Sequence, residues 1–304
     1  MLKLQDSNVA PGQASAAVTH PVAPQQQKGA GGTVTAGTAS VEVSQRKALL
    51  KTLRFHLWAP PLIAFLILGT IWQLVAISNP YVLPRAEAIV ASLFKSPGMY
   101  WSNLLVTAKE IVIGAGAGIL GGFLLAVFMA EFRIIERALM PLMVVIMVTP
   151  VVAIAPALVV AFGFGMMPKY IVTGLVVFFP MLMNSLAGLL GIDGKALDVM
   201  HTLHASRWEI FKHLRLPGSM PFVFAGLRVA LPLSVVGASV AEFVAAGQQA
   251  GVGSLLAISA AQANLPVTWA AILLLCLTGV VLIALLAVVR KKVLWWDDEV
   301  VVGR

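Results

Sequence analysis

Six long apolar segments, separated by short polar stretches, make up most of the chain. A membrane span needs about 20 residues, because a helix rises about 1.5 Å per residue and the hydrocarbon core is about 30 Å thick. Segments of sufficient length lie near residues 57–78, 109–130, 138–163, 168–190, 220–246 and 268–290. The pattern therefore predicts an all-α integral membrane protein with six transmembrane helices.

Residues 193–217, between the fourth and fifth of these segments, are too polar to lie in hydrocarbon. They include seven charged side chains and three histidines, and each charge at the centre of a bilayer costs about 3 kcal/mol. Asp193 can cap a first short helix, and Ser206 with Glu209 matches the capping-box pattern of a second. We predict a water-exposed loop of two short helices.

Each of these short helices carries apolar residues on one face. They are Ala196, Val199, Met200 and Leu203 in the first helix, and Ile210, Phe211 and Leu214 in the second. The Leu216-Pro217 pair is expected to end the second helix. Because the loop lies outside the membrane, its apolar faces predict a soluble partner that covers them.

The same loop has a spacing of residues that resembles a known motif. Asp198 is followed by His204, Leu214, Leu216 and Pro217. This spacing resembles the "EAA" loop of the membrane subunits of bacterial binding-protein-dependent ABC importers, in which the loop docks on the ATPase subunit and transmits its motion. The resemblance assigns ATPase coupling to Asp198, Met200, His204, Ala205, Ser206, Phe211, Leu214, Leu216 and Pro217.

His204 stands where that family has glycine. In the family, the glycine serves the turn between the two short helices, where a positive φ is often needed and a Cβ is a burden. The resemblance therefore places His204 in this turn.

Further segments resemble the nitrate, sulfonate and taurine branch of these permeases. They are Tyr81–Pro84, Leu203–Trp208, Gly226–Arg228 and Ala241–Phe243, and the similarity covers roughly residues 80–296. It implies a MetI-like type I permease that forms a homodimer, binds cytosolic ABC ATPase subunits and receives solute from an extracytoplasmic binding protein. The implied solute is a small organic or inorganic oxyanion such as a sulfonate, taurine or nitrate, although related permeases carry pyrimidines and other organic solutes. The chain would then be a transport subunit and not an enzyme.

Composition and charge agree with a membrane protein and give its expected orientation. Apolar residues form 59% of the chain, charged residues 11%, and the mean hydropathy is +0.92, whereas about a quarter of an ordinary soluble domain is charged. Lys and Arg gather before the first span, after the second, within residues 193–217 and after the last span. Both termini and the loop are therefore expected on the cytoplasmic side of a bacterial inner membrane. The net charge of +8 indicates this topology and not nucleic-acid binding.

The two ends of the chain differ from its apolar body. Residues 1–45 are rich in Gln, Gly, Ser and Thr and hold few large apolar side chains, so they cannot bury enough surface to offset the entropy of ordering. We predict a disordered cytoplasmic tail at 1–45, a transmembrane permease domain at 46–296 and a short C-terminal tail at 297–304.

No cofactor or nucleotide is expected on this chain. Residues 116–121 fit the dinucleotide fingerprint G-x-G-x-x-G, but they lie in an apolar span without a preceding strand. Gly114, Gly118 and Gly122 are spaced by four and predict instead a face for close helix packing. The sequence contains no phosphate loop of the form G-x-x-x-x-G-K-S/T, so ATP would have to bind another chain.

No metal ion is expected either. His201, His204 and His213 could suggest a metal site, and the first two could share a helix face. No Cys, Asp or Glu joins them at convincing ligand spacing, however, and the capping pattern explains the segment better.

Polar or helix-breaking residues inside the predicted spans are costly there, so they are candidates for the translocation pathway or its gate. They are Glu242, Thr149, Pro150, Asn184, Ser234 and Ser239. The alternative is that neighbouring helices repair the kinks and that Glu242 is a hydrogen-bonded packing residue. The sequence leaves both open. Arg228 is expected to reach the cytoplasmic interface or to pair with the loop.

Two other functional classes fit the sequence less well. A stand-alone ion- or proton-coupled transporter would be expected to show more intramembrane carboxylates or an inverted repeat. A membrane-embedded hydrolase would need a motif such as G-x-S-x-G or H-E-x-x-H, and the sequence has neither. The ion-coupled transporter is the alternative to the ABC permease.

Overall fold

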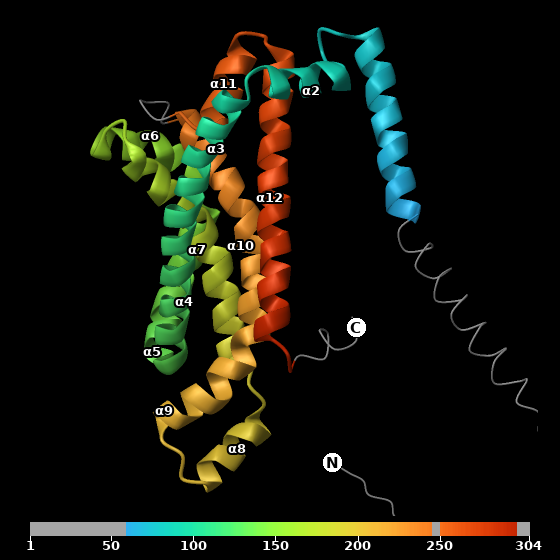
Figure 1. The fold of residues 1–304 in the computed structure, drawn as a ribbon. Coiled ribbons are helices and arrows are strands. Elements are labelled where there is room, and N and C mark those ends of the chain that lie inside the picture. The colour runs from blue at the N-terminus through green and yellow to red at the C-terminus, as the bar shows by residue number, and fades with distance from the viewer. Residues whose placement is uncertain (1–58, 245–249, 297–304) are drawn as a thin grey trace, which may run out of the picture. The chain divides into compact units, whose positions relative to one another are not determined.

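The computed structural model describes residues 59–244 and 250–296, and every regular element within these residues is a helix (Figure 1). The first helix runs from Ala59 to Ser78. The elements that follow are α2 (Ala86–Lys95), α3 (Pro97–Glu110), η1 (Ile111–Ala115), α4 (Gly116–Glu131), α5 (Arg133–Val148), α6 (Val151–Phe162), α7 (Met166–Leu190), α8 (Gly194–Thr202), α9 (Arg207–Ile210), η2 (Phe211–Arg215), α10 (Leu216–Val244), α11 (Val252–Ala261) and α12 (Leu265–Val293). Both η elements are π-helical turns. The predicted all-α fold class is confirmed.

The chain divides into two compact units, residues 1–65 and 66–304, and the packing described below lies within the second. The predicted tails at 1–45 and 297–304 lie outside the described residues. So do the boundary at residue 46 and the ends of two predicted spans, at 57–58 and 245–246.

Five helical stretches in the described part of the chain are long and apolar enough to cross a membrane, and each corresponds to one predicted span. They are Ala59–Ser78, Pro97–Glu131, Met166–Leu190, Arg207–Val244 and Leu265–Val293. The second begins at Pro97 and not near 109. Lys109 and Glu110 therefore lie inside this helix, where Glu110 is buried against the ammonium group of Lys169, which lowers the cost of its charge in apolar surroundings.

The third predicted span, 138–163, is not one continuous helix. It consists of α5 and α6, and α5 is inclined by 98° to the part of α6 from Ala153 to Phe162. The break falls at Thr149 and Pro150, both of which have extended backbones. A proline disfavours a helical conformation at the residue before it and cannot donate a backbone hydrogen bond. The bent pair makes a sixth crossing only if its two helices count as one span.

Small residues allow α4 and η1 to pack closely on α7. A Cβ at Gly118 would lie 2.2 Å from the Gly174 carbonyl oxygen, and one at Gly122 would lie 2.6 Å from the Phe178 carbonyl oxygen. At Gly114 the same atom would lie 2.8 Å from the Tyr170 carbonyl oxygen. The glycines therefore bring two helix backbones together, as their spacing predicted.

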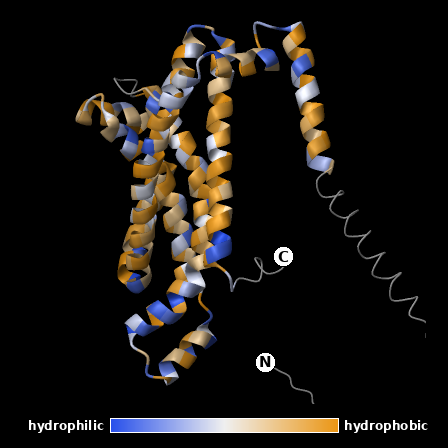
Figure 2. Cartoon of the chain, viewed as in Figure 1, coloured by the Kyte–Doolittle hydropathy of each residue, from blue (hydrophilic) through white to orange (hydrophobic). Residues whose placement is uncertain are grey.

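The bundle has two different ends. α7 packs against both α4 and α10, and α12 packs against α10 and α11. α11 lies at one end of these helices, whereas α8 and α9 project from the other end (Figure 1). Apolar residues dominate the long helices, and hydrophilic residues gather on α8 and α9 (Figure 2).

The helix α11 was not predicted, because its ten residues follow a Gly- and Gln-rich stretch that is typical of a loop.

Candidate functional site

The first short helix of the loop, α8, begins and ends as its sequence suggests. The Asp193 carboxylate accepts a hydrogen bond from the Lys195 N–H at 3.1 Å, which caps the start of the helix. At the other end, the His204 N–H donates to the His201 carbonyl and the Ala205 N–H donates to the Met200 carbonyl, both at 3.0 Å. This pair of bonds is the Schellman motif.

His204 occupies the left-handed position of that motif, with φ at 56°. Glycine is the usual residue there, because a Cβ opposes a positive φ. The structure thus supports the expectation that this turn needs a positive φ, and His204 is the residue that adopts it. Histidine tolerates this conformation better than branched residues do.

The second short helix, α9, has the predicted capping box. The Glu209 N–H donates to the Ser206 hydroxyl oxygen at 3.3 Å, and the Glu209 carboxylate accepts from the Ser206 N–H at 2.7 Å. Glu209 lies in the charged loop and is fully exposed. Hydrogen bonds from the Ser206 hydroxyl and N–H hold the pKa of its carboxyl below the usual value.

The Leu216-Pro217 pair does not end this helix, contrary to the prediction. The helix continues from α9 through η2 into α10, as one stretch from Arg207 to Val244. The Leu216 N–H donates to the carbonyl of Phe211, five residues earlier. This wider π-type turn comes just before Pro217, whose ring cannot donate the next hydrogen bond. The second loop helix and the fifth span are therefore one continuous helix.

The apolar face of the second loop helix is covered largely by the chain itself. Ile210 is buried, and Phe211 packs on a core cluster that includes Met129 of α4 and Leu186 of α7. The sequence-based interpretation assigned this face to a soluble partner, whereas Ile210 is buried within the chain and Phe211 packs on the chain's own core. They share the face of a helix that turns back toward the bundle, a direction that spacing along the chain cannot reveal.

Other apolar side chains of the loop are exposed. Val199 is 58% exposed, Leu203 is 71% exposed and Trp208 is 67% exposed. Trp208 stacks on Phe211 with 5.6 Å between ring centroids, so it rests on an anchored residue. Of the remaining predicted coupling residues, Asp198 and Ser206 are exposed, and five are half-buried. Those five are Met200, Ala205, Leu214, Leu216 and Pro217.

An ion pair ties the loop to the end of α4. The guanidinium group of Arg215 lies 3.3 Å from the Glu131 carboxylate, and both side chains are about a quarter exposed. The same guanidinium group donates to the Ala130 carbonyl at 3.4 Å. Together with the packing of Phe211, this contact fixes the second loop helix to the transmembrane bundle.

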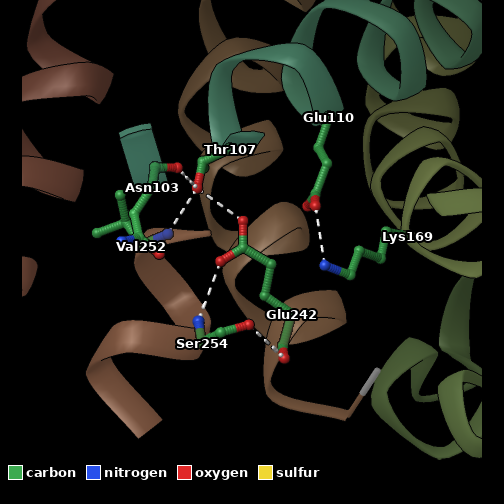
Figure 3. A network of polar contacts seen from close by, with 7 residues as sticks. All are labelled: Asn103, Thr107, Glu110, Lys169, Glu242, Val252 and Ser254. Carbon is green, nitrogen blue, oxygen red and sulfur yellow. Dashed lines mark hydrogen bonds and ion pairs between the residues drawn. The ribbon is translucent and has the colours of Figure 1, made fainter. Parts of the chain in front are cut away.

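A second group of polar residues lies at the opposite end of the bundle, around Glu242 (Figure 3). Glu242 belongs to α10 and is fully buried. Its carboxylate accepts a hydrogen bond from the Thr107 hydroxyl at 2.6 Å and one from the Ser254 N–H at 3.0 Å. The Val252 N–H donates to the Thr107 hydroxyl oxygen at 2.9 Å. Glu242 and Thr107 therefore satisfy two of the free N–H groups at the start of α11, which has no side-chain cap at Gly251.

Two glycines leave room for this carboxylate. A Cβ at Gly251 would lie 2.1 Å from a Glu242 carboxylate oxygen. At Gly253 it would lie 2.8 Å from the Ser239 Cα and 2.9 Å from a Glu242 oxygen. The Gly-rich sequence before α11 thus allows the backbone to approach Glu242 closely.

A buried ion pair lies beside this network. The Glu110 carboxylate of α3 is 3.2 Å from the Lys169 ammonium group of α7, with exposed fractions of 0% and 2%. Glu110 also lies within electrostatic reach of Glu242. Three titratable side chains from α3, α7 and α10 therefore lie close together among apolar residues.

The other predicted pathway residues do not join this network. The side chains of Thr149, Asn184, Ser234 and Ser239 each donate a hydrogen bond to a carbonyl of their own helix. Pro150 forms the bend between α5 and α6. Among the described residues, Glu242 alone of the six predicted positions makes hydrogen bonds between different helices.

Sequence reasoning missed several members of these two sites. Thr107, Ser254 and the pairing of Glu110 with Lys169 were not predicted, although two charges in otherwise apolar segments were a usable signal. Trp208 was not predicted as a site residue and was noted only as the end of a segment, Leu203–Trp208, that resembles related permeases. Its exposure depends on the direction of α9, which the sequence does not give.

Comparison with known proteins gives a consistent result. A family model described as "Binding-protein-dependent transport system inner membrane component" matches residues 118–295. The formylaminopyrimidine transport permease protein ThiX of Halalkalibacterium halodurans is 33% identical over 223 residues, which cover 72% of this chain and 88% of that protein. The riboflavin transport system permease protein RibX of Chloroflexus aurantiacus is 29% identical, over 71% of this chain and 81% of that protein. The taurine transport system permease protein TauC of Escherichia coli is 26% identical, over 61% and 71%.

Proposed function

Because this chain belongs to the family of inner membrane components of binding-protein-dependent transport systems, we propose that it couples an ATPase docked on residues 193–217 to a gate at Glu242. As a member of this family it is a permease subunit of an ABC importer for a small solute, and an ATPase and a solute-binding protein are its partners. We further propose its coupling route, its orientation, its dimeric state and its class of solute.

The continuous helix from Arg207 to Val244 is the observation that carries the proposal. It has 38 residues and a length of about 57 Å at the usual helical rise. Trp208 and the capping box lie near its start, and Glu242 lies two residues before its end. A displacement of the loop is therefore passed along one helix to the buried polar network.

The docking surface is formed by exposed residues of the loop. Val199, Leu203 and Trp208 offer apolar area, and Asp198 adds a charge next to it. Partly buried aromatic anchors contribute much of the affinity in protein interfaces. The loop is fastened to the bundle by Arg215 and Phe211, so a docked ATPase moves transmembrane helices and not only the loop.

At the other end, Glu242 holds α11 against α3 and α10 through its hydrogen bonds. A shift of α10 relative to α3 breaks these bonds and frees α11. Two such arrangements, biased by the nucleotide state of the ATPase, give alternating access. Five or six spans of one copy are too few to surround a solute path, so the proposal includes a second copy of this chain.

The proposed orientation places the loop and both termini in the cytoplasm and α11 on the outer side. Basic residues support it, because Arg290, Lys291 and Lys292 end α12 at the same end of the bundle as the loop. Lipid surrounds the exposed apolar faces of the long helices.

Two solute classes are candidates. The sequence resemblance favours a small oxyanion, and taurine, sulfonate and nitrate permeases are 24–26% identical to this chain. The formylaminopyrimidine and riboflavin permeases are more similar, at 33% and 29%, and they favour a nitrogen heterocycle. Uptake of a labelled pyrimidine, competed with taurine and nitrate in cells that express the whole transporter, separates the two classes.

Single-cysteine labelling tests the orientation and the docking together. Cys276 is the single cysteine of the chain. In a Cys276→Ser background, Leu203→Cys is expected to react with an impermeant reagent only from the cytoplasm and to cross-link to the ATPase subunit. Gln262→Cys, in the exposed turn after α11, is the matched control and is expected to react only from outside without cross-linking. Labelling of Leu203→Cys from outside would overturn the orientation and the docking role at once.

A further inference from the structure

A cavity of about 600 Å³ lies between α10 and α12, near the end of α12 that carries its basic residues. Its lining is largely apolar and includes Phe222, Ala225, Ile283 and Ala287. Two arginines, Arg228 from α10 and Arg290 from α12, also line it. Two guanidinium groups at one apolar cavity are unusual, because a charge in apolar surroundings requires a partner.

Arg228 has no such partner within the described part of the chain. It makes no ion pair or hydrogen bond there, and the expected pairing with the loop is not seen, since the loop's ion pair is formed by Arg215. Arg228 lies 12 residues after Leu216, which is about 18 Å along the axis of α10. Its side chain is exposed at the surface of the helix pair.

The apolar rim of the cavity is exposed at the surface of the helix pair. Phe222 is 46% exposed and Ile283 is 39% exposed, so the apolar rim faces outward and not into the core. An acyl chain can lie along such a rim. A phosphate group can accept forked hydrogen bonds from guanidinium groups, for which arginine is well suited.

We propose that this cavity binds the headgroup of an anionic phospholipid of the cytoplasmic leaflet, with its phosphate between Arg228 and Arg290 and an acyl chain along Phe222 and Ile283. Charge complementarity selects this occupant, because basic pockets between helices on the cytoplasmic side bind anionic headgroups. The choice of leaflet rests on the proposed orientation. The binding itself does not, and it can be measured without the ATPase.

Native mass spectrometry of the full-length chain in detergent tests the proposal. The chain is titrated with phosphatidylglycerol, phosphatidylcholine or inorganic phosphate. Each arginine is expected to contribute about fivefold to the affinity for the anionic lipid, so Arg228→Gln and Arg290→Gln should each weaken phosphatidylglycerol binding about fivefold. Phosphatidylcholine and inorganic phosphate should bind wild type and variants equally and weakly.

Three further variants sharpen the result. Lys292→Gln removes a nearby charge that does not line the cavity and should change the affinity less than twofold. Ala287→Trp keeps both arginines but fills the cavity, and should abolish the preference for phosphatidylglycerol. Arg228→Lys keeps the charge and should retain most of the binding even if Arg228→Gln does not fold.

The outcomes are distinct. Equal binding of the two lipids by wild type overturns the proposal, as does an equal effect of Lys292→Gln and Arg228→Gln, which would indicate diffuse surface charge. Competition by inorganic phosphate at the lipid concentration would indicate a free-anion site instead. Loss of the dimer mass in Arg228→Gln would assign the cavity to a second copy of the chain. Failure of the loop to dock an ATPase would leave the lipid result unchanged.

Discussion

The hydroxyl oxygen of Thr107 lies 2.6 Å from a carboxylate oxygen of Glu242, although 135 residues separate them along the chain. This hydrogen bond joins α3 to α10, and the same two side chains receive the Val252 and Ser254 N–H groups at the start of α11 (Figure 3). The start of a helix carries partial positive charge, which favours a carboxylate there. One buried residue thus fixes three helices at the end of the bundle opposite to the loop.

Replacement of Glu242 by Gln tests this arrangement. The amide group keeps one acceptor but turns an N–H₂ group toward either the Thr107 hydroxyl or the Ser254 N–H, so one hydrogen bond to a charged group is lost, at a cost of about 1.5–3 kcal/mol. We expect lower thermal stability and altered uptake, with the ATPase still bound. Ser239→Ala is the control, because that hydroxyl bonds only its own helix. If Glu242→Gln has the uptake and stability of wild type, Glu242 is only a packing residue and does not contribute to a gate.

Gly253→Ala tests the same contact from the backbone side. The added methyl group would lie 2.8 Å from the Ser239 Cα and 2.9 Å from the Glu242 carboxylate, so α11 has to move away from α10. Overpacking of this kind costs about 1–3 kcal/mol. Gly279→Ala on α12 is the matched control, since no atom lies within 4 Å of its Cβ. Thermal unfolding in detergent measures both, and equal unfolding temperatures would argue against the close approach.

Lys169→Met should be among the most destabilising changes in the spans. It leaves the Glu110 carboxylate buried next to Glu242 without the cation 3.2 Å away, and loss of one partner of a buried pair costs about 3–5 kcal/mol. The double variant Glu110→Gln with Lys169→Met should recover much of this loss, because no unpaired charge remains. A double-mutant cycle of unfolding free energies gives the coupling. Strict additivity of the two single changes would show that the pair is not an energetic unit.

The helices and the loop were predictable because their signals are local. Apolar length predicted the spans, and the Ser206 and Glu209 pattern predicted a capping box that the structure contains. The spacing of Gly114, Gly118 and Gly122 predicted a close helix contact. Pairing across the bundle was not predictable, since nothing local connects Glu110 to Lys169 or Thr107 to Glu242. The helix end at Pro217 was misplaced because a π-helical turn accommodates a proline that would end an ordinary helix.

His204→Gly should relax the turn between α8 and α9. A non-glycine residue in the left-handed region costs roughly 1–2 kcal/mol, and φ at His204 is 56°. We expect slower hydrogen exchange in the loop and unchanged or improved stimulation of the ATPase. Ala263→Gly relieves a similar φ of 55° at the end of α11 and should not affect the loop. Faster exchange in His204→Gly would mean that the histidine side chain itself stabilises the turn.

Docking of the ATPase on the loop is the central claim, and Trp208 is the residue that tests it most directly. Phe211→Ala is less informative, because Phe211 packs on the chain's own core. Asp198→Lys changes only a charge beside the docking surface, and we expect it to lower stimulated ATP hydrolysis without loss of assembly.

The decisive measurement is co-purification of the ATPase with Trp208→Ala, compared with Trp295→Ala. The two tryptophans are similarly exposed, at 67% and 71%, but only Trp208 lies in the loop. Truncation of a central aromatic anchor costs about 2 kcal/mol or more, which is about 30-fold in affinity. The account predicts that Trp208→Ala loses the ATPase and solute-stimulated hydrolysis while its unfolding temperature stays near that of wild type, and that Trp295→Ala keeps both. Full retention of the ATPase and of stimulated hydrolysis in Trp208→Ala would contradict it.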